Sequence, residues 1–394
     1  MEGLVGKDVL AARVRAVKPS GIRRFFDIAA TMPDVISLGV GEPDFVTPEH
    51  IRLAGIRAIT QGDTHYTSNY GTLELREAIA AHIERRYGVC YDPRSEIMVT
   101  VGVSEGVDVA LRALLDPGDE VLVPDPGYVA YEADVVFAGG AVVPVGTSMA
   151  DQFEVKAAAI EAQVSPRSKL LLLGNPNNPT GGVVARPELE RIAALAQRHD
   201  LLVLADEVYS RLVYGGEHTC MAALPGMRER TVLVDGFSKA YAMTGWRIGY
   251  ACAPAYILEA MLKIHQYAIM CAPTASQAAA LEALQYGEAD VQAMVADYDQ
   301  RRRLMVAGLN AAGLPCYEPH GAFYAFPSIA HTGLTSDDFA EKLLFEEHVA
   351  VVPGSAFGQA GEGFVRCAYC TAPDKIEEAL TRIARFVATH ADGH

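Results

Sequence analysis

The chain has 394 residues, of which 50% are hydrophobic and 21% are charged, and its formal net charge is −16. This composition excludes a disordered chain, and the dispersed acidic charge argues against nucleic acid or an anionic membrane as a main partner. The longest purely apolar runs have the length of a strand, so no membrane-spanning helix is expected. The first 20 residues lack the apolar core of a signal peptide. Seven cysteines, an odd number, favour a reduced cytoplasmic protein.

From about residue 70, the apolar pattern alternates between that of helices and that of strands. A helix is predicted where Leu75, Ile79, Ile83 and Tyr87 recur every four residues before Gly88. Short all-apolar strands separated by helices are typical of a mainly parallel sheet buried on both faces. Ligands bind such sheets beyond the carboxyl ends of the strands. The other predicted elements are strand 96–101 followed at once by a helix, strands 120–123 and 170–173, helix 187–199, and strands 201–205, 231–235 and 247–252.

After about residue 285 the pattern changes to a long charged helix at 289–311, a Gly- and Pro-rich segment and several short strands, which is typical of an α+β unit. The first 45 residues have no counterpart in the central sheet pattern. We therefore expect an α/β protein with a large domain at 46–285 and a small α+β domain built from 1–45 and 286–394.

A carboxylate follows the apolar strand 201–205, at Asp206. Its simplest interpretation is a helix cap or a surface loop. The alternative is an acid that keeps a cationic nitrogen of a ligand protonated, because a partly buried carboxylate needs a cationic partner.

A lysine follows the next strand, at Lys239, among Phe237, Tyr241, Met243 and the only tryptophan, Trp246. Such surroundings would remove water from the amine, lower its pKa and favour the neutral form that a Schiff base requires. The alternative is a lysine whose ammonium group reaches solvent. Eight residues further on, Arg247 is a natural partner for a phosphate.

Two more turns follow predicted strands. The turn at 174–181, rich in Asn, Pro and Gly, could simply be a tight turn. The turn at 102–106 runs from a strand directly into a helix, so its amides and the helix dipole could hold an anion. Together, a phosphate cradle, an acid, a buried lysine and an arginine are what pyridoxal phosphate requires.

The order and wording of these segments resemble the fold type I, class I/II aminotransferases, which depend on pyridoxal 5'-phosphate. The resemblance extends over roughly residues 15–390. The wording at Gly21–Phe26 and Val352–Gly358 is most similar to the aromatic/aspartate branch. The shared motifs are Gly41–Phe45, His65-Tyr66, Gly71–Arg76, Asn177–Gly181, Asp206–Tyr209, Ser238-Lys239, Met243–Arg247, Gly321–Tyr324 and Val365-Arg366.

The resemblance implies three catalytic residues. Lys239 would form the Schiff base with the cofactor and, once freed, move a proton to and from the substrate Cα. Asp206 would pair with the pyridinium nitrogen. Tyr209 and Asn178 would hydrogen-bond the 3' oxygen of the ring, on which Tyr128 would stack.

The resemblance also implies how the two anionic ends of the ligands are held. The α-carboxylate of the substrate would bind Arg366 as a bidentate pair, with help from Asn178 and the backbone at Gly41. Tyr66 would reach the phosphate from a neighbouring subunit, which implies a homodimer. The other phosphate contacts would be the amides of Val103, Ser104 and Glu105, together with Ser238 and Arg247.

Two positions depart from the family pattern. Many relatives have a serine three residues before the lysine, where this chain has Gly236, so one phosphate hydroxyl is missing and Ser238 must do more. Glu105 places a carboxylate beside the phosphate turn, which is tolerable if only its amide faces the ligand.

The histidines and cysteines give no metal-binding spacing. Cys367 and Cys370 form a CxxC in a predicted strand, where residues three apart point to opposite faces. No second cysteine or histidine pair accompanies them, so no metal is predicted. His265, His320 and His348 are expected to be structural.

The predicted activity is a ping-pong transfer of the amino group of an aromatic amino acid or aspartate to a 2-oxo acid, with 2-oxoglutarate as the expected acceptor. No residue is matched to the side chain of the substrate. Two alternatives are a C–S or other β-lyase on the same scaffold and a non-catalytic phosphate- or nucleotide-binding regulator. The regulator leaves Lys239, Asp206 and Asn178 without a purpose.

Overall fold

The computed structural model describes residues 9–17, 32 and 34–390. The motif at Gly21–Phe26 lies outside the described residues. Among the described residues, no helix is both long enough and apolar enough to cross a membrane.

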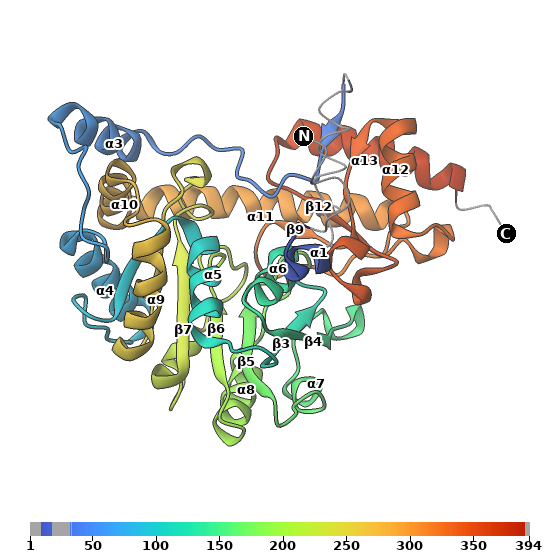
Figure 1. Cartoon of the computed structure of the whole chain (residues 1–394). Coiled ribbons are helices and arrows are strands. Elements are labelled where there is room, and N and C mark those ends of the chain that lie inside the picture. Colours follow the sequence, from blue (N-terminus) through green and yellow to red (C-terminus); the bar gives the residue numbers. More distant parts are fainter. Residues whose placement is uncertain (1–8, 18–31, 33, 391–394) are drawn as a thin grey trace, which may run out of the picture.

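A seven-stranded sheet forms the centre of the molecule, with strand order β2-β8-β7-β6-β5-β3-β4 (Figure 1). Strand β8 runs antiparallel to both of its neighbours, β2 and β7, and all other neighbouring strands are parallel. This arrangement confirms the mainly parallel sheet. The strands are β2 (Ile97–Thr100), β3 (Glu120–Asp125), β4 (Ala141–Gly146), β5 (Ser168–Gly174), β6 (Leu202–Asp206), β7 (Thr231–Gly236) and β8 (Gly249–Cys252).

Helices cover both faces of this sheet, as expected for strands without a polar face. Along β5, Leu170 and Leu172 pack in one hydrophobic cluster, and Leu171 and Leu173 pack in the opposite one. The first cluster includes residues of α5 (Gly102–Leu114), α6 (Val129–Phe137) and α9 (Ala255–Ala268). The second includes residues of α7 (Ala157–Glu161) and α8 (Arg186–Arg198).

Three further helices pack beside the β2 edge of the sheet (Figure 1). The helix predicted over Leu75–Tyr87 is confirmed as part of α4. The helix stops before Gly88, whose φ of 72° is left-handed. The three helices are α3 (Glu49–Gln61), α4 (Leu73–Tyr87) and α10 (Thr274–Tyr286).

The N-terminal segment is joined to the C-terminal part of the chain. Strand β1 (Ile36–Ser37) pairs in parallel with β10 (Val349–Ala350). A separate antiparallel sheet has the order β11-β12-β9, formed by Val352–Pro353, Val365–Ala368 and Tyr324–Ala325. Helices α12 (Ser336–Glu347) and α13 (Pro373–His390) pack together over this part, and α1 (Ala12–Ala16) contacts α6.

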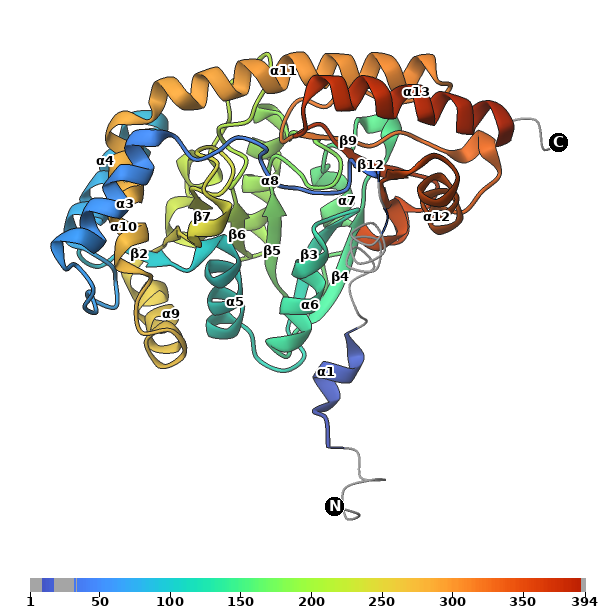
Figure 2. The same ribbon diagram turned by 90° about the horizontal axis from the view of Figure 1, so that it is seen from above.

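The longest helix, α11 (Glu288–Ala311), connects the two parts of the molecule. It contacts α10 at one end and α13 and β9 at the other, and Figure 2 shows it running along one side of the molecule.

One expected strand was placed wrongly, and one strand was missed. The strand predicted at 247–252 begins only at Gly249, because Arg247 has φ 50°, which a strand does not adopt. Strand β4 was not predicted, because it lies at the edge of the sheet and most of its residues are partly or fully exposed. Its apolar run is also interrupted by Pro144, which an edge strand tolerates but which argues against a central strand.

Candidate active site

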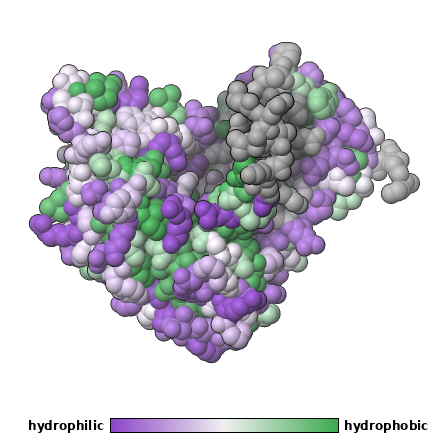
Figure 3. Space-filling model, in the orientation of Figure 1, coloured by the Kyte–Doolittle hydropathy of each residue, from purple (hydrophilic) through white to green (hydrophobic). Residues whose placement is uncertain are grey.

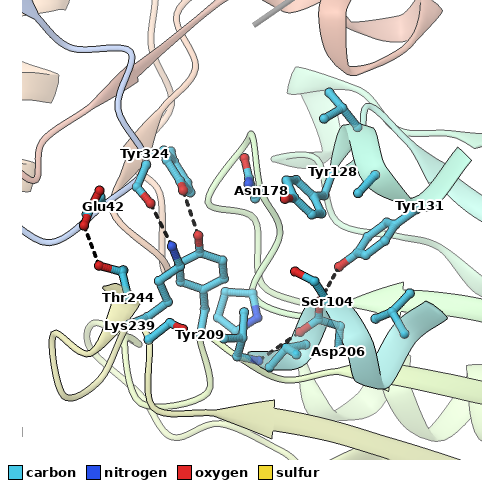
Figure 4. Close-up of a pocket in the computed structure, with 18 of the residues that line it drawn as sticks. Glu42, Ser104, Tyr128, Tyr131, Asn178, Asp206, Tyr209, Lys239, Thr244 and Tyr324 are labelled. Carbon is cyan, nitrogen blue, oxygen red and sulfur yellow. Dashed lines mark hydrogen bonds between the residues drawn. The ribbon is translucent and has the colours of Figure 1, made fainter. Parts of the chain in front are cut away.

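A cavity of about 500 Å³ opens at the carboxyl ends of the parallel strands, between the central sheet and the C-terminal part (Figure 4). Its lining includes many residues to which the sequence analysis gave roles. These are Gly41, Val103, Ser104, Tyr128, Asn178, Asp206, Tyr209, Ser238, Lys239, Arg247 and Arg366.

Two residues with predicted roles do not line this cavity. The side chain of Glu105 turns away from it, toward the N–H of Val101 and the ring of His265. Tyr66 is 80% exposed on the surface of the chain. In a single chain, Tyr66 therefore takes no part in the cavity.

Asp206 ends β6 and is held by two donors. Its Oδ2 accepts a hydrogen bond from Tyr131 Oη at 2.8 Å, and its Oδ1 accepts one from Val208 N at 3.1 Å (Figure 4). Burial raises the pKa of Asp206 to about 6, and the two hydrogen bonds oppose that rise. Such a carboxyl group favours a cationic partner in the cavity.

Lys239 projects from the turn after β7, and its Nζ donates a hydrogen bond to Gly41 O at 2.7 Å. Nζ lies 5.9 Å from the ring centre of Tyr209 and 5.7 Å from that of Phe323. Burial lowers the pKa of this amine to about 8. The amine is therefore directed into the cavity and is not extended into solvent.

A pair of tyrosines stands beside the lysine. The hydroxyl groups of Tyr209 and Tyr324 are 2.7 Å apart, and both rings are buried (Figure 4). A Cβ at Gly41 would collide with the hydroxyl of Tyr324, so this position of the N-terminal segment requires glycine.

The turn between β2 and α5 has the features of an anion cradle. Gly102 has φ 73°, and a Cβ there would lie 2.7 Å from Nη2 of Arg247. Val103 and Ser104 follow in the first turn of α5, where free N–H groups and the helix dipole favour an anion. Ser238 lines the same cavity, so a phosphate group fits the donors present here.

A buried arginine lies at another wall of the cavity. Arg366 is 3% exposed, and it donates to Asn178 Oδ1 at 2.9 Å and to Gly39 O at 2.6 Å. Within the described part of the chain no carboxylate pairs with it, and its Nε has no hydrogen-bond partner. A buried guanidinium group in this state fits a carboxylate supplied by a ligand.

Tyr131 and Tyr324 were missed by the sequence analysis. Tyr131 lies in α6, one helical turn after Tyr128. Tyr324 is the last residue of the motif Gly321–Tyr324, which was given no role. Neither pattern indicates which group the hydroxyl contacts. Residues 9–17, 32 and 34–390 contain no cluster of three histidine, cysteine, aspartate or glutamate side chains that could hold a metal ion.

Comparison with known proteins decides the family. The model of the class I and II aminotransferases matches residues 33–383. The chain belongs to this family. The aminotransferases of this family use pyridoxal phosphate, and the acid, the lysine and the anion cradle described above fit that cofactor.

Relatives of this aminotransferase match it over nearly its whole length. The Bacillus subtilis protein YugH is 53% identical over 378 residues, which cover 96% of this chain and 98% of the relative. The aspartate aminotransferase of Pyrococcus abyssi is 47% identical over 381 residues, with 96% and 98% coverage. The structure of an aromatic aminotransferase from Pyrococcus horikoshii has a TM-score of 0.89 at 45% identity and covers 93% of this chain and 99% of that one.

Proposed function

We propose that this aminotransferase moves the amino group of an aromatic amino acid or aspartate to a 2-oxo acid, with 2-oxoglutarate as the acceptor. The observation that carries the proposal is the meeting of Lys239, Asp206 and Arg366 in one cavity. These three side chains come from three separate elements, and each has the chemistry that one part of the reaction needs.

When bound, the cofactor supplies the electron sink that makes the α-proton of the substrate acidic. Lys239, whose pKa is lowered by burial to about 8, is the base that takes this proton, holds it at Nζ and returns it later in the cycle. The carboxylate of Asp206 would pair with the protonated ring nitrogen of the cofactor, and the hydrogen bond from Tyr131 keeps this carboxylate in place.

The remaining contacts orient the two ligands. Arg366 binds the α-carboxylate, with the amide of Asn178 beside it. Tyr209 and Asn178 bind the 3' oxygen of the cofactor, and Tyr128 stacks on its ring. The phosphate is held by the amides of Val103, Ser104 and Glu105, and by Ser238 and Arg247.

The charges of the cavity favour an aromatic donor over aspartate. The cations that line the cavity in the described chain are Lys239, Arg247 and Arg366, and each already has a role above. The acidic lining groups are Asp206, which also has a role above, Glu42 and Asp134. Glu42 would repel a second carboxylate of the substrate, whereas burial raises the pKa of Asp134 to about 7. Relatives with both names, aspartate and aromatic aminotransferase, match the chain at similar identity.

The working form is a homodimer in the cytoplasm, with Tyr66 contributed across the interface. The segment that carries Tyr66 contacts the segment that exposes Tyr267, Ile269 and Met270. Asn69 Nδ2 donates to Met270 O at 2.6 Å, and Thr274 Oγ1 donates to His65 O at 2.8 Å. Hydrophobic residues also gather in patches between hydrophilic ones on the face in Figure 3. All seven cysteines are free thiols, which supports a reducing compartment.

Visible absorbance and product analysis test this proposal. The purified holoenzyme should be yellow, and it should form glutamate from 2-oxoglutarate with phenylalanine or tyrosine faster than with aspartate. Lys239→Ala should fold, as judged by circular dichroism, form no glutamate and retain no covalently bound cofactor after borohydride reduction and denaturation. Covalent retention of the cofactor by this variant would contradict the role of Lys239, and release of ammonia and pyruvate without glutamate would indicate a lyase.

A further inference from the structure

A buried carboxylate–imidazole pair lies behind the phosphate turn, on the side away from the cavity. Glu105 is in the first turn of α5, and His265 is in the last turn of α9, which packs against α5 (Figure 1). The Nδ1 of His265 donates to Glu105 Oε1 at 2.6 Å, and the side chains are 0% and 10% exposed. The roles proposed above use neither side chain.

The second oxygen of Glu105 binds the backbone at the start of the turn. Its Oε2 accepts the N–H of Val101 at 2.5 Å, and Val101 is the N-cap of α5, whose own side chain makes no capping bond. The carboxylate therefore joins the beginning of the turn to α9. Val103 and Ser104, which line the cavity, lie in the segment held between these two contacts.

The pair also fixes the direction of the Glu105 carboxylate. A carboxylate at position 105 that turned toward the cavity would meet the phosphate of the cofactor with like charge. Its bonds to His265 and to Val101 N direct it to the opposite side of the helix. A carboxylate that lost its buried partner would be left without compensation beside the phosphate turn.

From this geometry we infer that His265 is a positioning residue for cofactor binding. Through Glu105 it holds the phosphate turn in shape and keeps the carboxylate directed away from the phosphate. The inference rests on the phosphate site proposed above, and it assigns a task to two residues that do not touch the cofactor through their side chains.

The main-chain bonds of His265 do not depend on its ring. Its carbonyl oxygen accepts the N–H groups of Ile269 and Met270 at 2.8 and 3.0 Å, which close the end of α9. A replacement of the side chain by leucine leaves these bonds in place and fills most of the ring's volume. The effect of such a variant then reports on the pair with Glu105.

Cofactor release from the holoenzyme tests the inference in three variants: His265→Leu, Glu105→Gln and the two combined. His265→Leu should raise the dissociation constant of pyridoxal phosphate about tenfold, because a buried carboxylate has lost a charged hydrogen bond. Glu105→Gln should change it less than about threefold, since a neutral amide oxygen still accepts from Val101 N. The combined variant should bind the cofactor more tightly than His265→Leu, and kcat of His265→Leu at saturating cofactor should stay within about twofold of that of the unaltered protein.

Pyridoxal, which lacks the phosphate, provides the control ligand. His265→Leu should leave its affinity unchanged. Equal weakening of pyridoxal and pyridoxal phosphate, or a combined variant no tighter than His265→Leu, would overturn the inference and leave the pair a purely structural contact. If the unaltered protein bound both compounds equally well, the phosphate site itself would be wrong.

His265→Gln provides a variant that keeps a donor for Glu105, in case the leucine variant does not fold. Its dissociation constant for pyridoxal phosphate should lie within about threefold of that of the unaltered protein. A tenfold loss in this variant, with an unchanged melting temperature, would also overturn the inference.

Discussion

At the scale of single residues, the state of Lys239 determines how the protein captures its cofactor. A pKa of about 8, lowered by burial, leaves about a tenth of the amine neutral at pH 7. A solvent-exposed lysine would have on the order of one neutral amine in several thousand at that pH. Burial of Lys239 in the turn after β7 therefore leaves part of this amine neutral and nucleophilic before any ligand binds.

The rate at which the cofactor-free chain reacts with pyridoxal phosphate should therefore rise with pH and level off above a midpoint near pH 8. The amine must be neutral to attack the aldehyde, so protonation below its pKa slows the reaction. Stopped-flow absorbance at a series of pH values measures this midpoint, with N-acetyl-lysine amide as the exposed reference. A midpoint near that of the reference, above pH 10, would show that Lys239 is not desolvated.

The sequence could predict residues at strand ends but not their partners across the fold. Asp206 and Lys239 follow apolar strands directly, so their place at the edge of the sheet was visible. Tyr131 binds a group 75 residues away, and Tyr324 one 115 residues away. No local pattern encodes contacts of that separation, which depend on how the elements pack against one another in space.

At the scale of elements, the cavity depends on a close approach of backbones where β2 and β7 end and β8 begins. Gly249 pairs with Thr100 on one side and with Gly236 on the other. A Cβ at Gly249 would lie 2.8 Å from Val103 N and 2.9 Å from Gly102 C, so the phosphate turn rests directly on this glycine. A Cβ at Gly236 would lie 3.0 Å from Val103 Cγ2, so the space for a serine there is already filled.

Gly249→Ala should weaken both the fold and cofactor binding, because backbone atoms that cannot rotate away meet the added methyl group. Overpacking of this kind costs about 1–3 kcal/mol of unfolding free energy. Chemical denaturation and the dissociation constant of pyridoxal phosphate measure the two effects. Gly245→Ala is the matched control, since Gly245 is exposed and has open space around its Cβ position, and both values should be unchanged in it.

Boundaries of elements were predictable only where apolar periodicity decided them. The buried strands β5, β6 and β7 begin and end within two residues of the expected positions. Arg247 was placed in a strand because its neighbours on the C-terminal side are apolar, but its left-handed conformation directs the guanidinium group toward Gly102. A positive φ at a residue other than glycine does not change the apolar pattern, so the sequence could not predict this conformation.

At the scale of the whole molecule, we propose the division into a domain at 46–285 and a second one from 1–45 and 286–394. The pairing of β1 with β10 and the separate sheet β11-β12-β9 support this division. The sequence predicts it because the chain changes its pattern near residue 285. The assembly of two chains could not be read from any pattern and was inferred only from the family.

Substitution of the exposed side chains near Tyr66 should separate the proposed dimer. The combined variant Tyr267→Glu and Met270→Glu places two charges where the chain exposes 87% and 43% of these residues. Light scattering should give twice the mass of one chain for the unaltered protein and a single mass for the variant, which should also bind the cofactor more weakly because Tyr66 is lost. Phe345→Glu, on α12 and 52% exposed at that residue, should remain a dimer. A monomeric unaltered protein would contradict the proposal.

Helix α11 joins the two parts of this enzyme through one rigid element. With 24 residues it is a rod about 36 Å long, and it is fixed at both ends by contacts with α10 and with α13. Near its middle, Arg301 binds Asp44 at 2.8 Å, so the rod also holds the N-terminal segment that crosses the cavity at Gly41. Side chains of this helix are buried along its length, from Val291 to Leu309, so the rod is held in place by packing as well as at its ends. The N-terminal segment at Gly41, whose carbonyl accepts from Lys239 Nζ at 2.7 Å, and the C-terminal part that carries Arg366 are therefore anchored to one common rod.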